Sequence, residues 1–156
     1  MTDASDEPQE NAAADHELIR RRDAAQKTLD TWSSRPQKLG TADCVRMVAA
    51  HLRSLGYKVK LPPAGSYRSV NSAMKALRAA GHDSIGAALD AIGLERIAPA
   101  ATIVGDVMLM PAEHELGALV VVMGNGRVAG WHDDYDEGVV VMQPLLMLAA
   151  WRVAPK

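Results

Sequence analysis

The spacing of apolar residues changes near residue 95, and this change constrains the fold more than any other feature of the chain. Before it, apolar residues recur every three or four positions, as in amphipathic helices. After it, short runs rich in β-branched residues predict strands. Helices followed by strands predict an α+β domain, with the helices packed on a C-terminal antiparallel sheet and no alternating βαβ units.

Capping residues and glycines predict four helices in the first part. The first has a narrow apolar side, so we expect it on the outside of the domain. The second opens at Cys44 and is capped by Thr41 or Asp43. The four helices are expected from Leu18 to residues 33–36, from Cys44 to Gly56, from Ser69 or Asn71 to Gly81, and from Asp83 or Ser84 to Gly93.

Three or four antiparallel strands are expected in the second part, from four short β-rich runs. They cover residues 107–110, 118–123, 127–131 and 139–142. The Gly124-Asn125-Gly126 sequence between the second and third predicts a tight hairpin, because these residue types tolerate positive φ. Pro144 is expected to start a last helical turn through Ala150, and residues 151–153 to add a closing edge strand.

Length and charge limit the organisation and the partners. The 156 residues fit one domain, expected at 18–156. Residues 1–17 carry acidic groups and no Lys or Arg, which predicts a disordered tail. The net charge of −2, with scattered Lys and Arg, argues against a nucleic-acid partner. The longest apolar run, 117–123, is too short to span a membrane, and neither a secretion signal nor a cysteine pair is present, so we expect a cytoplasmically made protein.

Cys44, the only cysteine, is the sharpest chemical feature. A thiol in the first turn of a helix faces free N–H groups and the positive end of the helix dipole, which favour the nucleophilic thiolate. The alternative is a small buried hydrophobe, which is the commoner role for an isolated cysteine.

A nucleophilic thiol needs an imidazole within hydrogen-bond reach. His51 lies on the same helix but about 10 Å along it, so it is expected to be a surface or interhelix residue. His16 and His82 are expected to be solvated. This leaves His114 and His132 as possible bases, and the choice between them stays open.

The acidic run after Trp131 raises the question of a metal site. Residues 131–137 combine imidazole and carboxylate groups, but their spacing fits no calcium loop, since Leu145 occupies the position of the closing glutamate. A polar turn is favoured, and neither a metal nor another cofactor is expected.

Three short motifs, at residues 40–45, 105–109 and 119–126, occur in an order that resembles the NlpC-type branch of the papain-like cysteine peptidases. This branch has an Asp-Cys pair at a helix start, a Gly-Asp-hydrophobic strand and a strand that runs into a Gly-Asn-Gly hairpin. Closer still are uncharacterised NlpC-like proteins of phages, prophages and gene transfer agents, which resemble residues 67–69, 76–81, 97–100 and 150–153.

The resemblance implies a papain-like fold, Cys44 at the nucleophile position and cell-wall peptides as the usual substrate. It also implies that the catalytic base of these peptidases is missing here. The position of the catalytic histidine is occupied by Ala118, and the third polar position falls near Gly130, two residues before His132. Without a base, proton transfer loses on the order of a hundred- to ten-thousand-fold in rate.

Two main hypotheses follow. The first is a degenerate NlpC-like domain that serves as a structural or binding component of a phage or prophage tail, with virion proteins as partners and a virion-associated location. The second is an active cysteine hydrolase of peptidoglycan peptides, with Cys44 as nucleophile, His132 or His114 as base, and Asp133 or Asp106 orienting that base. A weaker third is an interaction adaptor that uses the acidic segment 1–17.

Overall fold

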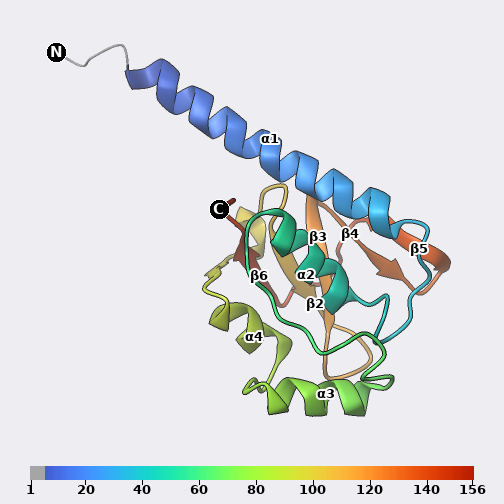
Figure 1. The fold of residues 1–156 in the computed structure, drawn as a ribbon. Coiled ribbons are helices and arrows are strands. Elements are labelled where there is room, and N and C mark those ends of the chain that lie inside the picture. Colours follow the sequence, from blue (N-terminus) through green and yellow to red (C-terminus); the bar gives the residue numbers. More distant parts are fainter. Residues whose placement is uncertain (1–5) are drawn as a thin grey trace.

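The computed structural model describes residues 6–156, which form helices packed on one antiparallel sheet (Figure 1). The expected α+β architecture is confirmed. Ser69 and Ser84 cap α3 and α4 by accepting the backbone N–H three residues on. The helices are α1 (Asp6–Trp32), α2 (Cys44–Ser54), α3 (Val70–Ala79) and α4 (Ile85–Ala91), with a 3₁₀ turn at Pro99–Ala101.

The sheet of the described residues has six strands in the order β1-β6-β2-β3-β4-β5, all antiparallel to their neighbours. The predicted hairpin joins β3 to β4. Asn125 and Gly126 both have positive φ, 55° and 71°, as such a turn requires. The strands are β1 (Glu95–Ile97), β2 (Val107–Met110), β3 (Ala118–Gly124), β4 (Arg127–His132), β5 (Tyr135–Met142) and β6 (Ala149–Arg152).

The C-terminal segment differs from the prediction. The helical turn expected from Pro144 to Ala150 does not form, and Ala149 already belongs to β6. This strand is not an edge strand, because it pairs with both β1 and β2. The reason is Trp151, whose fully buried side chain belongs in the middle of the sheet. The true edge on this side, β1, has only three residues and was not predicted.

The first helix also starts earlier than expected. Residues 6–17, where a disordered tail was expected, continue α1, while residues 1–5 lie outside the described part. Ala and Glu are strong helix formers, and Pro8 falls in the first turn, where no amide hydrogen is needed. Figure 1 shows α1 projecting well beyond the body of the domain. None of the helices in residues 6–156 combines the length and apolarity needed to cross a bilayer.

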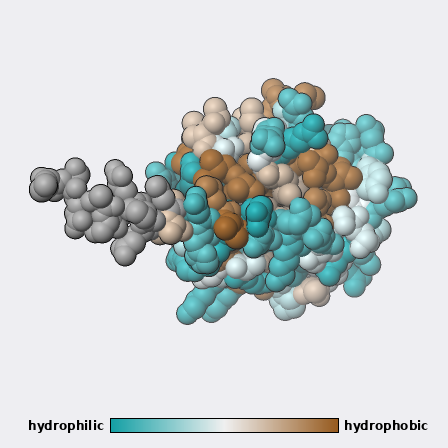
Figure 2. All heavy atoms as spheres, turned by 90° about the horizontal axis from the view of Figure 1, so that it is seen from above, coloured by the Kyte–Doolittle hydropathy of each residue, from teal (hydrophilic) through white to brown (hydrophobic). Residues whose placement is uncertain are grey.

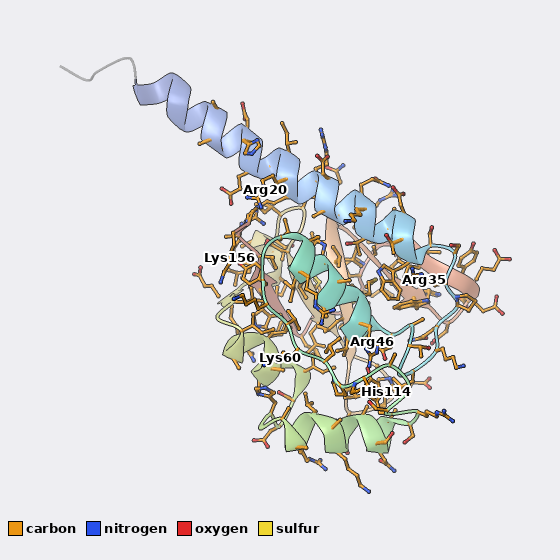
Figure 3. The ribbon with its side chains drawn as sticks, in the orientation of Figure 1. Arg20, Arg35, Arg46, Lys60, His114 and Lys156 are labelled. Atoms are coloured by element: carbon orange, nitrogen blue, oxygen red, sulfur yellow. The ribbon has the colours of Figure 1, made fainter. Side chains whose placement is uncertain are left out.

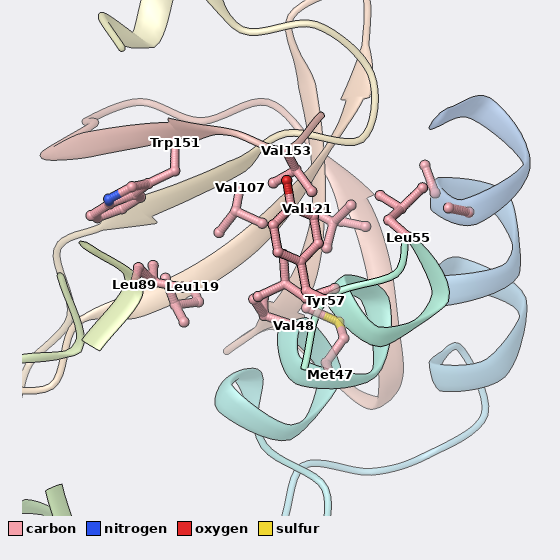
Figure 4. Packing of buried hydrophobic residues seen from close by; sticks show 14 of the residues in the cluster. Met47, Val48, Leu55, Tyr57, Leu89, Val107, Leu119, Val121, Trp151 and Val153 are labelled. Atoms are coloured by element: carbon pink, nitrogen blue, oxygen red, sulfur yellow. The ribbon is translucent and has the colours of Figure 1, made fainter. Parts of the chain in front are cut away.

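The main core lies between α2 and the sheet, with α1 across the same side (Figures 1 and 4). Met47 and Val48 of α2 face Val107 and Val121 of the sheet in Figure 4. Alternate strand residues point to the opposite face and build a second cluster. It contains Met108, Val120, Val122 and Val128, flanked by Met110 and Met142.

Some apolar residues remain at the surface, as the brown areas in Figure 2 show for the face seen from above. On α1, Leu18 and Ile19 are exposed. Residues 143–148 connect the edge strand β5 to β6 across the intervening strands, and Leu145 in this connection is 90% exposed. Leu146, Met147 and Leu148 are exposed as well, so this connection carries four consecutive exposed apolar residues.

Candidate functional site

Cys44 is the first residue of α2, and the loop before it is held by Asp43. One Asp43 oxygen accepts the N–H of Arg46 at 2.9 Å, so Asp43 is the helix cap. The other oxygen accepts the Gly40 N–H and the Tyr67 hydroxyl, both at 2.8 Å. Gly40 has a φ of +97°, and any side chain there would collide with the carbonyl oxygen of Tyr67. These contacts fix the position of the thiol.

The surroundings of the thiol keep it protonated. Burial raises the pKa of Cys44 to about 11, and the nearby charge of Asp43 acts in the same direction. The backbone N–H groups of Leu119, Val45 and Cys44 itself favour the thiolate but do not compensate. The helix start was expected to favour a nucleophilic thiolate. Desolvation outweighs that effect here.

Cys44 opens onto a large apolar cavity of about 670 Å³. Its walls come from α2, α3, α4 and the beginning of β3. Ala118, which the resemblance to NlpC-type peptidases matches to a catalytic histidine, lines the same cavity. The apolar walls include Val45, Val48, Ala73, Ala76, Leu77, Ile85, Ala88, Leu89, Ile92, Leu116 and Leu119.

Polar side chains also line the cavity, some of them buried, such as Asp43, and others exposed, such as Lys60. Figure 3 labels two of them, Lys60 and His114, in the layer between α2 and α3. Asp43 is the only carboxylate of the lining, and its two oxygens already accept three hydrogen bonds. The full polar set is Gln37, Asp43, Lys58, Lys60, Tyr67, His82 and His114.

The two predicted bases have different environments. His114 is an exposed residue in the β2–β3 connection and lines the Cys44 cavity. His132 ends β4, is exposed and does not line the cavity, and its Nδ1 accepts the N–H of Asp134 at 3.0 Å. In the described part of the chain, no hydrogen bond joins the Cys44 thiol to an imidazole.

His82 was predicted to be solvated, but it is half-buried and also lines the cavity. It precedes α4 in the turn that follows α3, and its N–H bonds the carbonyl oxygen of Leu77. The Gly-His-Asp sequence gave no sign of this, because the cavity exists only after α3 and α4 fold back over the start of β3. His16, on the projecting part of α1, is exposed as expected.

The two predicted orienting carboxylates lie elsewhere. Asp106 is completely buried before β2 and accepts a hydrogen bond from Arg21 Nη1 at 3.0 Å. It also accepts the N–H groups of Ile103 and Val153, both at 2.9 Å. Asp133 is exposed in the β4–β5 turn. Within residues 6–156, neither carboxylate is hydrogen-bonded to His114 or His132.

His51 lies deep in the core between α1 and α2. Its Nε2 is 2.8 Å from the Gly105 carbonyl oxygen, and its Nδ1 is 2.9 Å from the Thr28 hydroxyl. Burial lowers its pKa, so the ring is neutral at pH 7, donating from Nε2 and accepting at Nδ1. His51 is therefore an interhelix residue, one of the two roles expected for it, with no access to the thiol.

Metal ligands do not converge in the part of the chain that the structure describes: no group of three or more His, Cys, Asp or Glu side chains is placed to hold an ion. The residues of the acidic turn after β4 are exposed. The site is therefore described by its thiol, its apolar walls and its basic margin.

These features define a small α+β protein with a half-buried cysteine at a helix start, facing an apolar cavity. The model of a family described as a domain of unknown function, DUF6950, matches residues 18–153. The chain therefore belongs to the DUF6950 family. No curated protein sequence is similar enough to match it.

Proposed function

We propose that this DUF6950 protein is a degenerate NlpC-type papain-like domain that works as a structural or binding component of a phage or prophage tail, without peptidase activity. The observation that carries the proposal is the pairing of Cys44 with Ala118 in one cavity. A methyl group cannot accept the proton of the thiol, and burial raises the pKa of that thiol to about 11.

The papain-like part of the proposal is supported by the order and packing of elements. A helix that begins with an Asp-Cys pair packs on β3, whose residue Leu119 directs its backbone N–H toward the sulfur. The same strand continues into the Gly-Asn-Gly hairpin. These are the pieces on which the resemblance to NlpC-type enzymes rests.

The tail assignment rests on the resemblance of residues 67–69, 76–81, 97–100 and 150–153 to the NlpC-like proteins of phages, prophages and gene transfer agents. In the structure these segments lie at the two ends of α3, at the end of β1 and along β6. Virion proteins are the proposed partners, and association with the virion is the proposed location.

A second function is favoured by one observation: His114 lines the same cavity as Cys44. If the β2–β3 connection brought this imidazole to the sulfur, the protein would be a cysteine hydrolase of peptidoglycan peptides. Such a mechanism would need His114 to act without the buried Asp106, which is occupied by Arg21.

The test compares the wild type with Cys44→Ala and His114→Ala in two assays. One is release of peptides from purified peptidoglycan fragments, and the other is assembly of infectious or transducing particles. We expect no peptide release from any of the three proteins and unchanged particle yield with Cys44→Ala. Peptide release by the wild type that is lost in both variants would replace the proposal with the hydrolase.

A gain-of-function variant sharpens this test. Ala118→His places an imidazole at the cavity position that the family's base would occupy. We expect alkylation of Cys44 by iodoacetamide at pH 7 to rise at least about tenfold, because a neighbouring imidazole stabilises the thiolate. Ala112→His, exposed and outside the cavity, is the matched control and should leave the rate unchanged. Equal rates for the two variants would count against papain-like geometry.

A further inference from the structure

We infer that the Cys44 cavity binds an unbranched aliphatic carboxylate, with the chain between α2 and α3 and the carboxylate at the lysine-bearing margin. This inference deepens the proposed function and rests on it, because it assigns a ligand class to a cleft that does not perform peptidase chemistry.

The aliphatic part of the ligand is inferred from the apolar walls of the cavity. The cavity of about 670 Å³ lies within the range of small-molecule sites. Leu77 of α3, Leu89 of α4 and Val48 of α2 approach it from three sides and offer no hydrogen-bonding side chain. A peptide in this space would leave its backbone groups without partners, at a high cost in free energy. An aliphatic chain carries no such groups.

The structure also explains why the space stays open. The buried side of α3 is supplied mainly by Met74, and the rest of its inward face consists of half-buried residues such as Ala73, Ala76 and Leu77. Ala118 and Ala88 are small where larger residues would fill the cavity. The protonated thiol of Cys44 behaves as a further apolar group.

The negative head group of the ligand is inferred from the basic side chains along the cavity. Lys58 and Lys60 line the margin and are exposed, and neither has a carboxylate within 4.0 Å among residues 12–156, whose side chains the structure describes. His82 and His114 lie along the same cavity. The only acidic side chain of the lining, Asp43, is buried at the start of α2, where it accepts three hydrogen bonds, and it is outnumbered by the two lysines. A negative head group is therefore attracted, and a positive one meets like charges.

The experiment titrates the full-length protein with sodium dodecanoate by calorimetry, below the concentration at which micelles form. Decanoate and dodecyltrimethylammonium serve as matched probes that change the chain length or the sign of the head group. We expect dodecanoate to bind about fifteenfold more tightly than decanoate, from two additional buried methylenes. The cationic probe should bind at least tenfold more weakly than dodecanoate.

Paired variants locate the binding site. Ala76→Trp fills the cavity from α3 and should abolish binding, whereas Ala79→Trp, exposed on the same helix and outside the cavity, should leave it intact. Replacement of Lys58 and Lys60 by Glu should weaken dodecanoate binding at least tenfold, while Lys75→Glu, an exposed α3 residue outside the lining, should not. The far-ultraviolet circular dichroism of each variant reports whether it folds.

Three results would overturn the inference: no heat with dodecanoate, equal affinity for the cationic probe, or equal effects of the two Trp variants when both are folded. Binding to phosphatidylglycerol vesicles without binding to free dodecanoate would also overturn it, in favour of a membrane surface. A different result would contradict the proposed function. It would appear as Cys44-dependent peptide release, whatever the calorimetry shows.

Discussion

The surroundings of helix α2 differ on its two sides. Toward α1, His51 lies near a buried cluster in which Asp106 joins Arg21 of α1 to the backbone before β2 and after β6. Toward α3, Cys44 meets a cavity with apolar walls, and no hydrogen bond joins its thiol to an imidazole in the described part of the chain. In the first region the buried polar groups have partners, as stable folding requires. The comparison indicates that the buried charge of this domain stabilises the fold and does not activate the thiol.

The largest loss of stability is expected when the buried cluster around Asp106 is broken. Asp106→Ala leaves the Arg21 side chain, 3% exposed, with the half-exposed Glu17 as its remaining carboxylate partner and none in the core. Removal of one partner of a buried ion pair costs about 3–5 kcal/mol. We therefore expect a loss of this size in the free energy of unfolding, measured by urea denaturation.

The control for this variant is Asp23→Ala, which breaks the exposed pair between Asp23 and Arg22 on the same helix. It should change stability by less than about 1 kcal/mol. A similar loss in the two variants would mean that the Asp106 cluster has no special role in the fold.

A smaller loss of stability is expected when Asp43, the residue before Cys44, is replaced. Asp43→Ala removes the cap of α2 and leaves the Tyr67 hydroxyl without its acceptor. The expected destabilisation is about 2 kcal/mol. Thr41→Ala, an exposed residue two positions earlier, is the matched control and should stay within about 0.5 kcal/mol of the wild type. The prediction fails if Thr41→Ala costs as much as Asp43→Ala.

The pH dependence of stability separates the buried histidine from the exposed ones. Burial lowers the pKa of His51 in the folded protein below 6.5, so the unfolded chain binds a proton first as the pH falls. Stability should therefore decrease from about pH 6.5 downward, by at most about 1.4 kcal/mol per pH unit from this residue. Urea denaturation at several pH values measures the slope. His51→Gln should flatten it, and His132→Gln, exposed, should not; equal slopes in all three proteins would contradict the assignment.

The local features of the fold could be predicted from the sequence, whereas several long-range ones could not. The helix caps at Asp43, Ser69 and Ser84 and the hairpin at Asn125 each depend on a few neighbouring residues. Those residues can be read directly from the sequence. The position of β6 depends on pairing with β1 and β2, which lie about 55 and 40 residues away. Nothing local to Trp151 distinguishes an edge strand from an inner one.

The candidate site was predictable in part. The setting of Cys44 at the helix start followed from the Asp-Cys pair. The expectation that a catalytic base is missing came from the resemblance, at Ala118, and stays a prediction. The cavity did not follow from the sequence, because its walls come from α2, α3, α4 and β3. Asp106 was considered for an orienting role, but its partner Arg21 belongs to a run of three arginines that gave no indication of which one is buried.

The reactivity of Cys44 tests the central claim most directly. As the only cysteine, it can be alkylated with iodoacetamide across a pH series in the native protein and again in denaturant, where it has the reactivity of a free thiol. We predict a native pKa near 11. This corresponds to about a hundredfold less thiolate at pH 7 than in the unfolded chain, and to slower alkylation. A native thiol that reacts faster than the unfolded one, with a pKa below 9.0, would contradict the inactive cleft.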